Sequence, residues 1–514
     1  MKGRRYIYIA VIAFIVTAFT SAQEKPNILF IAIDDMNDWI GPLGGLGDLP
    51  KTPNLDKLAR QSITFTNAHC ASPACSPSRL SIMSGIQPSR SGKMCNEWYD
   101  GPGWRKEAIF MDIETIEQFF RNRGYETLAG GKIYHTLAPP WTTLNHADPD
   151  GWDYYFPSIY GPIPYQVRAP EEVIRPEHFK GDRLQWFTWG PVNVDDQKMA
   201  DYQVVDWARY ELGRKHEKPL YLACGIFRPH MPWEVPQKYF DLYPLEEIPG
   251  LVIDDNDLED SYEHGRRQWH KFVLENEQWE KVIQAYLASI SFSDAMLGRL
   301  LDGLDQSAYV HNTIVVLWAD HGMHIGEKEN WEKFTLWEES TRVPLIIRPV
   351  ACKNPGESCD EPVSLLDIYP TLVELAGFTA PDHCDGVSLL DQLNNPEKER
   401  KINALTSFTF GGRMDRAAHT LRSRDFRYIF YEDNKLEELY DHRSDPNEFI
   451  NLAYDSGYRK VVKEFRREMA ERVERVSMEM MEQDPVGYDI INNRPVSNVY
   501  LPLSKIDLNP AEGE

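Results

Sequence analysis

The chain has 514 residues, of which 55 are Lys or Arg and 79 are Asp or Glu, so its formal net charge is −24 at pH 7. Such an acidic chain lacks the basic face that DNA or RNA requires, and we expect no nucleic-acid partner. Hydrophobic residues make up 42% of the chain, which excludes a mostly disordered protein. The length exceeds that of one ordinary core, so two or three domains are expected.

Residues 1–22 predict an export signal. Three basic residues at positions 2, 4 and 5 precede an apolar stretch, Tyr6 to Phe19, and small residues at 20–22 stand where a signal peptidase would cut. The alternative is an uncleaved anchor, but the stretch is shorter than the ~20 apolar residues that span a bilayer. No later run is long and apolar enough for a span. We therefore predict an exported protein, periplasmic or secreted, that is free of the membrane after cleavage.

Between residues 23 and 402, apolar runs alternate with amphipathic segments. Strands are predicted over 27–35, 125–131, 219–227, 313–320 and 343–349. Helices are predicted to begin at Thr52-Pro53 and to run over 113–124, 195–214, 279–304 and 363–377. Runs that are apolar on both faces suit the central strands of a parallel sheet. The alternation predicts an α/β domain with a mostly parallel sheet and helices on both faces.

From residue 403 the pattern changes. Short strand-like pieces separated by turns lie between 417 and 433, and one charged amphipathic helix follows Gly457. This order predicts a smaller α+β domain over 403–514, with an antiparallel sheet and a packing helix.

The segment between Asn96 and Gly190 is rich in loops and aromatic residues. These rings either pack the loops onto the sheet or form a wall that stacks on sugar faces. Loops of this length often carry function, so both alternatives stay open.

The chain has seven cysteines, an odd number that leaves at least one thiol outside any disulfide. Export permits disulfides, and Cys352 and Cys359 bracket a loop that a disulfide could close. Cys224 lies in an apolar strand-like run and is expected to be a buried packing residue.

Two predicted strands end in acidic residues: Asp34-Asp35 after the first, and Asp320 with His321 after the fourth. Ligands of open α/β sheets collect at the carboxyl ends of the strands, so these side chains are expected to meet at one edge. Three converging carboxylates need a cation, because their mutual repulsion would otherwise raise their pKa values. Oxygen-rich ligand sets favour Ca²⁺ or Mg²⁺, although a single His is atypical for calcium.

The segment "CSPSRLSIMSG" predicts a helix that begins just after Cys75, because Pro77 suits a first turn. A helix N-terminus stabilises negative charge, and Arg79 lies one turn further along, within reach of the same anion. From these residues alone, Cys75 is a thiolate nucleophile, a disulfide partner or a core residue.

The motif "CSPSR", with Gly85 downstream, resembles the signature of the type I sulfatases. Further matching parts follow the family's order: "AIDD", "CSPSR", "GGKIYH", "FRPHMPW", "ADHGMHIGE" with Lys333, and "ELYDHRSDPNEFINLA" in the smaller domain. "GKIYH" and "RPHMPW" are most similar to the iduronate-2-sulfatase branch. The resemblance implies an alkaline-phosphatase-like fold and a sulfuric ester hydrolase.

The resemblance also implies that a formylglycine-generating enzyme oxidises Cys75 to Cα-formylglycine (3-oxoalanine). One hydroxyl of its hydrate attacks sulfur, and the second then loses a proton so that the carbonyl reforms and sulfate leaves. Metal ligands carried over from the family are Asp34, Asp35, Cys75, Asp320 and His321. Calcium is the expected ion, with Mg²⁺ less favoured.

The remaining roles are implied in the same way. Arg79 would hold the diol, and Lys132 and Lys333 would grip the sulfate oxygens. His135 would take the proton from the second hydroxyl, and His230 would protonate the departing sugar oxygen.

The predicted substrate is a sulfated poly- or oligosaccharide, either an algal polysaccharide such as ulvan or carrageenan or a glycosaminoglycan. One alternative is a phosphoester or phosphonate hydrolase on the same scaffold, and another is an inactive glycan-binding relative.

Overall fold

The computed structural model describes residues 25–96, 102–135, 150–156, 187–250, 256–262 and 267–473. The predicted signal over 1–22, much of the aromatic segment and the end of the chain after 473 lie outside these residues. Within these described ranges, no helix combines the length and the apolar character of a membrane span.

Eight strands of the described chain form one sheet in the order β11-β2-β10-β9-β1-β7-β4-β5. Their bounds are β1 Asn27–Ile33, β2 Ile63–Phe65, β4 Glu126–Gly131, β5 Tyr154–Phe156, β7 Leu220–Ile226, β9 Thr313–Ala319, β10 Leu345–Arg348 and β11 Ser358–Cys359. Strands β1, β4, β5, β7 and β9 are parallel, whereas β10 runs antiparallel to both β9 and β2. The mostly parallel sheet is confirmed, with the predicted strand at 343–349 as its antiparallel member.

The central strands β1, β7 and β9 are buried at every residue. Ile33, the last residue of β1, pairs with Ala319 of β9 on one side and with Ile226 of β7 on the other. All three strands therefore end level, and the residues that follow them start from the same edge.

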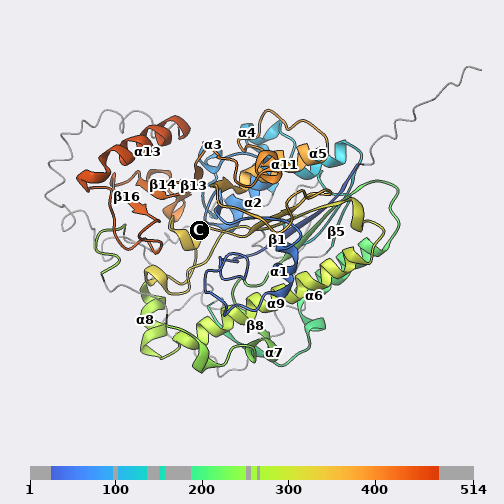
Figure 1. Cartoon of the computed structure of the whole chain (residues 1–514), viewed down its shortest axis with the longest axis horizontal. Coiled ribbons are helices and arrows are strands. Elements are labelled where there is room, and N and C mark those ends of the chain that lie inside the picture. The colour runs from blue at the N-terminus through green and yellow to red at the C-terminus, as the bar shows by residue number, and fades with distance from the viewer. Residues whose placement is uncertain are drawn as a thin grey trace, which may run out of the picture.

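Helices cover both faces of this sheet (Figure 1). Helices α1, α6 and α9 lie on one side, and α2, α5 and α11 lie on the other. Their bounds are α1 Pro53–Ala59, α2 Cys75–Ser84, α5 Ile116–Asn122, α6 Ala200–Gly213, α9 Trp279–Asp305 and α11 Ile368–Leu375. Shorter elements are α3 Pro88–Ser91, α4 Ala108–Met111, α7 Gln237–Phe240, α8 Arg267–Glu275, α10 Glu338–Thr341, α12 Leu390–Asn394, β3 Ala68–His69, β6 Trp189–Val192, β8 Trp233–Pro236 and β12 Val363–Ser364.

Two predicted helices are shorter than the sequence pattern indicated. The segment 195–214 contains a 3₁₀ turn over Asp196–Lys198 and an extended Met199, and only then does α6 begin. The segment 363–377 begins with β12 and a 3₁₀ turn, because the Ser364 side chain accepts from the Leu366 backbone N–H and Asp367 accepts from the Ser364 backbone N–H. Polar side chains that bond local backbone groups thus replaced the first helical turn.

The smaller domain has the predicted architecture. Strands β13 Ala404–Thr409, β14 Ala417–Arg422, β15 Phe426–Tyr431 and β16 Glu437–Asp441 form an antiparallel sheet in chain order. Helix α13, Arg459–Arg472, is the amphipathic helix predicted after Gly457. It packs buried apolar side chains against this sheet. We call β13–β16 with α13 the small subdomain; the predicted boundary after residue 402 stays a prediction.

None of the seven cysteines, all of which lie in the described part of the chain, forms a disulfide, so the loop between Cys352 and Cys359 is not closed by one. Cys224 is fully buried in β7, in agreement with its predicted packing role. In the described part of the aromatic segment, Trp104, Phe187 and Trp189 are packed and at most 4% exposed, whereas Tyr154 is 49% exposed.

Candidate active site

The carboxyl edge of the sheet gathers the predicted site residues. Asp34 follows β1 and Asp320 follows β9, and the in-register pairing of these strands brings the two carboxylates together. Lys132 follows β4, and the segment with His230 follows β7. The edge that the sequence singled out is therefore the edge where these side chains meet, as expected of an open α/β sheet.

Asp35 turns the chain at the end of β1 with a positive φ of 60°, a conformation that non-glycine residues rarely adopt. Its backbone N–H donates to Asp320 Oδ1 over 3.1 Å, and its carbonyl accepts from the Tyr286 hydroxyl over 2.8 Å. These bonds hold a strained backbone in place, and strain of this kind is common at functional sites. The turn buries the Asp35 carboxylate completely.

Cys75 is the first residue of α2, whereas the sequence predicted that the helix begins just after Cys75. Its Sγ lies 3.1 Å from His321 Nε2 and 3.9 Å from Asp35 Oδ1. Its neighbour Ser76 donates its backbone N–H to Asn96 Oδ1 over 3.0 Å, which satisfies one free donor of the helix end. The nucleophile predicted from the motif thus faces the cluster of strand-end acids.

Arg79 joins two of these acids. Its Nε donates to Asp320 Oδ2 over 2.8 Å, and its Nη2 donates to Asp34 Oδ1 over 3.0 Å. Its Nη1 donates to the carbonyls of Lys132 and Ile133. The guanidinium is wholly buried, so it fixes the spacing of the two carboxylates as well as neutralising them.

Lys132 and Lys333 complete the charge balance. The Lys132 ammonium pairs with Asp34, and Lys333 Nζ lies 2.8 Å from both oxygens of Asp35. Both lysines are at most 5% exposed. With Arg79 they supply three buried cations against three buried carboxylates, which lets these ionised groups remain buried together.

The cluster shifts the pKa values of its members. Burial opposes ionisation of the Cys75 thiol, but Lys132, Lys333 and His321 outweigh it and hold the pKa well below its usual range. Burial raises the pKa of Asp35 despite nearby His230 and Lys333. Burial would lower the pKa of His321, yet Asp320 and Cys75 raise it to about 9. The site therefore favours an anion at position 75.

Two further histidines, His135 and His230, belong to the same group of predicted site residues as Cys75. His135 is 4% exposed, and burial lowers its pKa to about 4 even though the Cys75 side chain opposes this shift. A neutral imidazole at this position can accept a proton. His230 Nδ1 lies 2.6 Å from the Met231 carbonyl, which only accepts, so Nδ1 carries the hydrogen and Nε2 faces the cluster, 3.8 Å from Asp35 Oδ2.

Several supporting residues escaped sequence reasoning. Tyr286, an apparent core residue of α9, bonds the Asp35 turn, and Ser78 Oγ donates to the Asp320 carbonyl over 2.5 Å. Asp201 on α6 accepts from the backbone N–H groups of residues 227 and 228, before His230. Ser78 lies inside the "CSPSR" motif without a role assigned from it, and no local motif marks Tyr286 or Asp201, because their partners lie far away in the chain.

The donor set fits a divalent cation. One ligand atom from each of five buried residues lies within 4.8 Å of all the others, and these residues are Asp34, Asp35, Cys75, Asp320 and His321. His321 donates Nδ1–H to the Gly322 carbonyl over 3.0 Å, which directs Nε2 at the carboxylates as metal-ligating histidines require. Hard carboxylate oxygens dominate this set and favour Ca²⁺ or Mg²⁺.

A second cluster of acidic residues with a histidine is not a candidate metal site. Glu338, His442 and Glu448 also bring possible ligand atoms together. Arg422 Nη2 lies 2.9 Å from His442 Nδ1, and Arg427 Nε lies 2.5 Å from Glu448 Oε1. Arg422 and Arg427 therefore already bond the His442 nitrogen and the Glu448 oxygen, which are possible ligand atoms for a metal ion.

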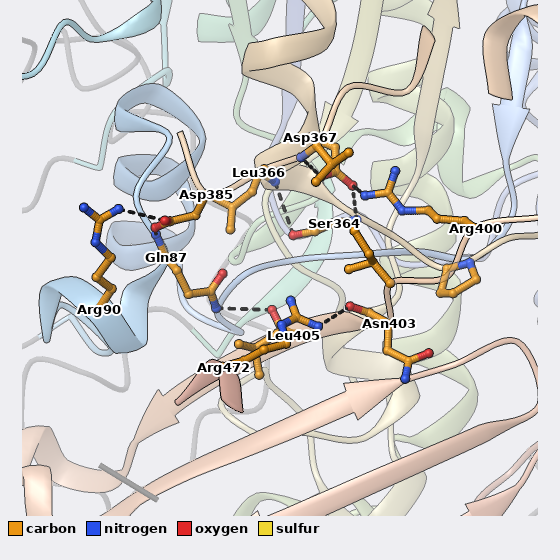
Figure 2. Close-up of a pocket in the computed structure, with 14 residues that line it drawn as sticks. Gln87, Arg90, Ser364, Leu366, Asp367, Asp385, Arg400, Asn403, Leu405 and Arg472 are labelled. Atoms are coloured by element: carbon orange, nitrogen blue, oxygen red, sulfur yellow. Dashed lines mark hydrogen bonds and ion pairs between the residues drawn. The ribbon is translucent and has the colours of Figure 1, made fainter. Parts of the chain in front are cut away.

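A cavity of about 230 Å³ opens between the large domain and the small subdomain (Figure 2). Its charged lining is paired internally: Arg90 with Asp385 over 2.7 Å, and Arg400 with Asp367 over 2.7 Å. None of the predicted catalytic residues lines it. The reactive groups therefore lie in the cluster at the sheet edge and not in this cavity.

Comparison with known proteins agrees with this geometry. The family model "Sulfatase" matches residues 26–378, and the model "N-sulphoglucosamine sulphohydrolase, C-terminal" matches residues 326–475. A sulfatase of Formosa agariphila is 37% identical over 442 residues, which is 84% of this chain and 83% of that protein. The mouse (Mus musculus) iduronate 2-sulfatase is 29% identical over 71% of each chain.

The phosphonate monoester hydrolase of Agrobacterium radiobacter has the same fold, with a TM-score of 0.70 at 19% identity over 88% of this chain and 96% of that one. The alkaline-phosphatase-like architecture expected from the sequence is thereby confirmed. The fold and the site define a hydrolase with a buried cysteine in a cluster of acidic and basic side chains. The chain belongs to the sulfatase family and is a sulfuric ester hydrolase, with iduronate 2-sulfatases among its relatives.

Proposed function

We propose that the chain is an exported carbohydrate sulfatase, periplasmic or secreted, whose Cys75 is converted to Cα-formylglycine by a formylglycine-generating enzyme. The observation that carries this proposal is the setting of Cys75, which lies 3.1 Å from His321 Nε2 among buried carboxylates and lysines. The sequence from Cys75 to Arg79 also matches the family signature.

Residue 75 performs the displacement once it carries the aldehyde hydrate. One hydroxyl of the hydrate gives up its proton to solvent, its oxygen attacks sulfur, and the bond from sulfur to the sugar oxygen breaks. The sugar oxygen takes a proton from His230 and departs as the alcohol. The second hydroxyl then loses its proton, the carbonyl reforms, and the bond from carbon to the sulfate oxygen breaks. Inorganic sulfate leaves and the aldehyde is ready for hydration. An ordinary Ser or Cys adduct has no such internal exit.

The two histidines move the protons of these steps. His135 accepts the proton from the second hydroxyl, because burial keeps its imidazole neutral at neutral pH. His230 donates the proton that the leaving sugar oxygen needs, since its Nε2 faces the cluster and its side chain is 16% exposed. A partly exposed ring can be reached by a substrate that enters from solvent.

The lysines bind the sulfate group. Lys132 and Lys333 pair with Asp34 and Asp35, and substrate oxygens would share these ammonium groups. Charge acts strongly in a buried site, whereas the chain's overall negative charge is screened beyond about 8 Å at physiological salt. An acidic protein can therefore bind an anionic ester.

A divalent cation, which we propose to be Ca²⁺ with Mg²⁺ less favoured, would be held by Asp34, Asp35, Asp320, His321 and converted residue 75. When bound, it supplies charge that polarises the sulfate ester and lowers the pKa of a hydroxyl. The three carboxylates are already balanced by three cations, so the ion would give the site an excess of positive charge. An anionic sulfate ester complements that excess.

The proposed substrate is a sulfated poly- or oligosaccharide, either an algal polysaccharide such as ulvan or carrageenan or a glycosaminoglycan. The iduronate 2-sulfatase relative supports a sugar sulfate, and its name indicates a uronic acid. The test is release of inorganic sulfate from a panel of such oligosaccharides by protein coexpressed with the maturation enzyme. Conversion of Cys75 is verified by peptide mass.

A second candidate is a phosphoester or phosphonate hydrolase, supported by the shared fold of a phosphonate monoester hydrolase. Matched sulfate and phosphate esters separate the two, because much faster hydrolysis of the phosphate ester would contradict the sulfatase proposal. The inactive glycan-binding alternative predicts saccharide binding without cleavage of any ester in the panel.

A further inference from the structure

The loop that carries Lys333 has an unusual backbone. It runs from Gly322 to Trp337, between the end of β9 and helix α10. Three of its non-glycine residues have positive φ: Lys328 at 54°, Glu329 at 52° and Phe334 at 75°. Such conformations persist only where the surroundings impose them. Phe334 directly follows Lys333. The strained backbone therefore adjoins the residue whose ammonium group pairs with Asp35.

The small subdomain supplies several of the contacts that hold this backbone, beside contacts to the rest of the chain such as the bond from the Phe334 backbone N–H to the Pro73 carbonyl over 3.1 Å. Arg427 of β15 donates Nη1–H to the Leu336 carbonyl over 3.0 Å. Trp337 donates its indole N–H to Glu438 Oε2 of β16 over 2.9 Å. The Lys328 ammonium donates to the Glu448 carbonyl, just after β16. The loop is therefore bonded at Lys328 and at its end, Leu336 and Trp337, to a part of the chain about 100 residues away.

Arg427 is the centre of these contacts. Its side chain is wholly buried, with Nε 2.5 Å from Glu448 Oε1 and Nη2 bonded to Glu338, the first residue of α10. One planar guanidinium thus joins the loop carbonyl of Leu336, the helix that ends the loop, and a carboxylate of the small subdomain. A lysine could not reach three acceptors in this geometry.

We infer that Arg427 is a positioning residue for Lys333, through which the small subdomain sets the place of one sulfate-binding cation. This inference rests on the proposed function, since it assigns Lys333 to the sulfate group. Arg427 donates its hydrogen bonds to Glu448, Leu336, Thr420 and Glu338, so it acts on Lys333 through Leu336 and α10 and not by direct contact. A displacement of about 1 Å in a binding group can lower kcat/KM about 100-fold.

The test compares Arg427→Met with Arg466→Met. Arg466 of α13 makes a similar two-bond pair with Glu437 of β16 inside the small subdomain, so its loss is a matched control. Arg427→Met is expected to lower kcat/KM for a sugar sulfate about 100-fold, and Arg466→Met less than about threefold. Equal losses in the two variants would overturn the inference.

A double-mutant cycle separates positioning from general damage. If Arg427 acts through Lys333, adding Arg427→Met to Lys333→Ala causes no further loss of kcat/KM, because the group being positioned is already gone. If the two losses multiply, the inference is wrong. Trp337→Phe, which removes only the indole bond to Glu438, replaces Arg427→Met in the same cycle if the latter does not fold.

Hydrogen exchange tests the inference without any substrate. Arg427→Met should speed amide exchange over residues 330–337, and Arg466→Met should not. Unchanged exchange in this segment would overturn the positioning role. An inactive wild-type protein whose exchange pattern follows this expectation would instead contradict the proposed function and leave the loop attachment intact.

Discussion

The replacement of His230 by alanine should distinguish a proton donor from a residue that only binds substrate. The ring stacks on Phe227 with centroids 4.6 Å apart, and its Nδ1–H is committed to the Met231 carbonyl. Nε2 is therefore the atom that can protonate a leaving oxygen. A sugar alcohol leaves poorly without a proton, whereas the phenolate of an activated aryl sulfate needs none.

General acid catalysis contributes about 10²- to 10⁴-fold to a rate, equivalent to about 2.7 to 5.4 kcal/mol of transition-state stabilisation. His230→Ala should lose that factor on a sugar sulfate and less than about tenfold on an aryl sulfate, where only packing on Phe227 is lost. The assay is kcat/KM for both substrates with the same converted protein. Equal losses on both substrates would refute the proton-donor role.

His216→Ala is the matched control. This buried histidine lies before β7 at the opposite edge of the sheet, where it contacts Glu126 Oε2 over 3.0 Å. Its removal should affect the two substrates equally, because any effect would act through stability alone.

Three further predictions follow from the site. Cys75→Ala should abolish turnover and leave circular dichroism unchanged, and surviving activity would contradict the mechanism. Chelation by EDTA should stop sulfate release, with Ca²⁺ restoring it better than Mg²⁺; full activity in EDTA would exclude the metal role. Burial lowers the pKa of His324 to about 3, so only the unfolded chain takes up its proton as pH falls from 6.5 towards 3. Stability is therefore complete above pH 6.5, and this residue should account for a loss of about 2 kcal/mol between pH 7 and 5, measured by urea unfolding. His324→Gln should make that decline shallower; an identical decline would contradict the assignment.

The sequence predicted the sheet edge well because short apolar runs bounded by turn residues are typical of central strands. The runs before Asp34 and Asp320 are buried at every residue, and their in-register pairing places both acids where topology demands. Helix starts were less predictable. At Thr52 the residue type suggested a side-chain cap, yet its hydroxyl accepts from Gly41, and Asp294 of α9 accepts from the first backbone N–H groups of α1.

The residues that support the site could not be predicted because their contacts are remote in the chain. Tyr286 bonds residue 35 from 251 positions away, and Arg427 reaches Leu336 from 91 positions away. Each has the local pattern of an ordinary helix or strand residue. Motif spacing marks groups that react, whereas the groups that hold them are specified by packing.

We propose that residue 75, once converted, releases sulfate from a saccharide. The most direct measurement is inorganic sulfate released from sulfated algal and glycosaminoglycan oligosaccharides, with the formylglycine content of the peptide that contains residue 75 measured by mass in the same preparation. We expect sulfate release from at least one oligosaccharide in proportion to the conversion of Cys75, and no sulfate release by the Cys75→Ala variant. Release that is independent of conversion, or none from fully converted protein across the panel, would contradict it.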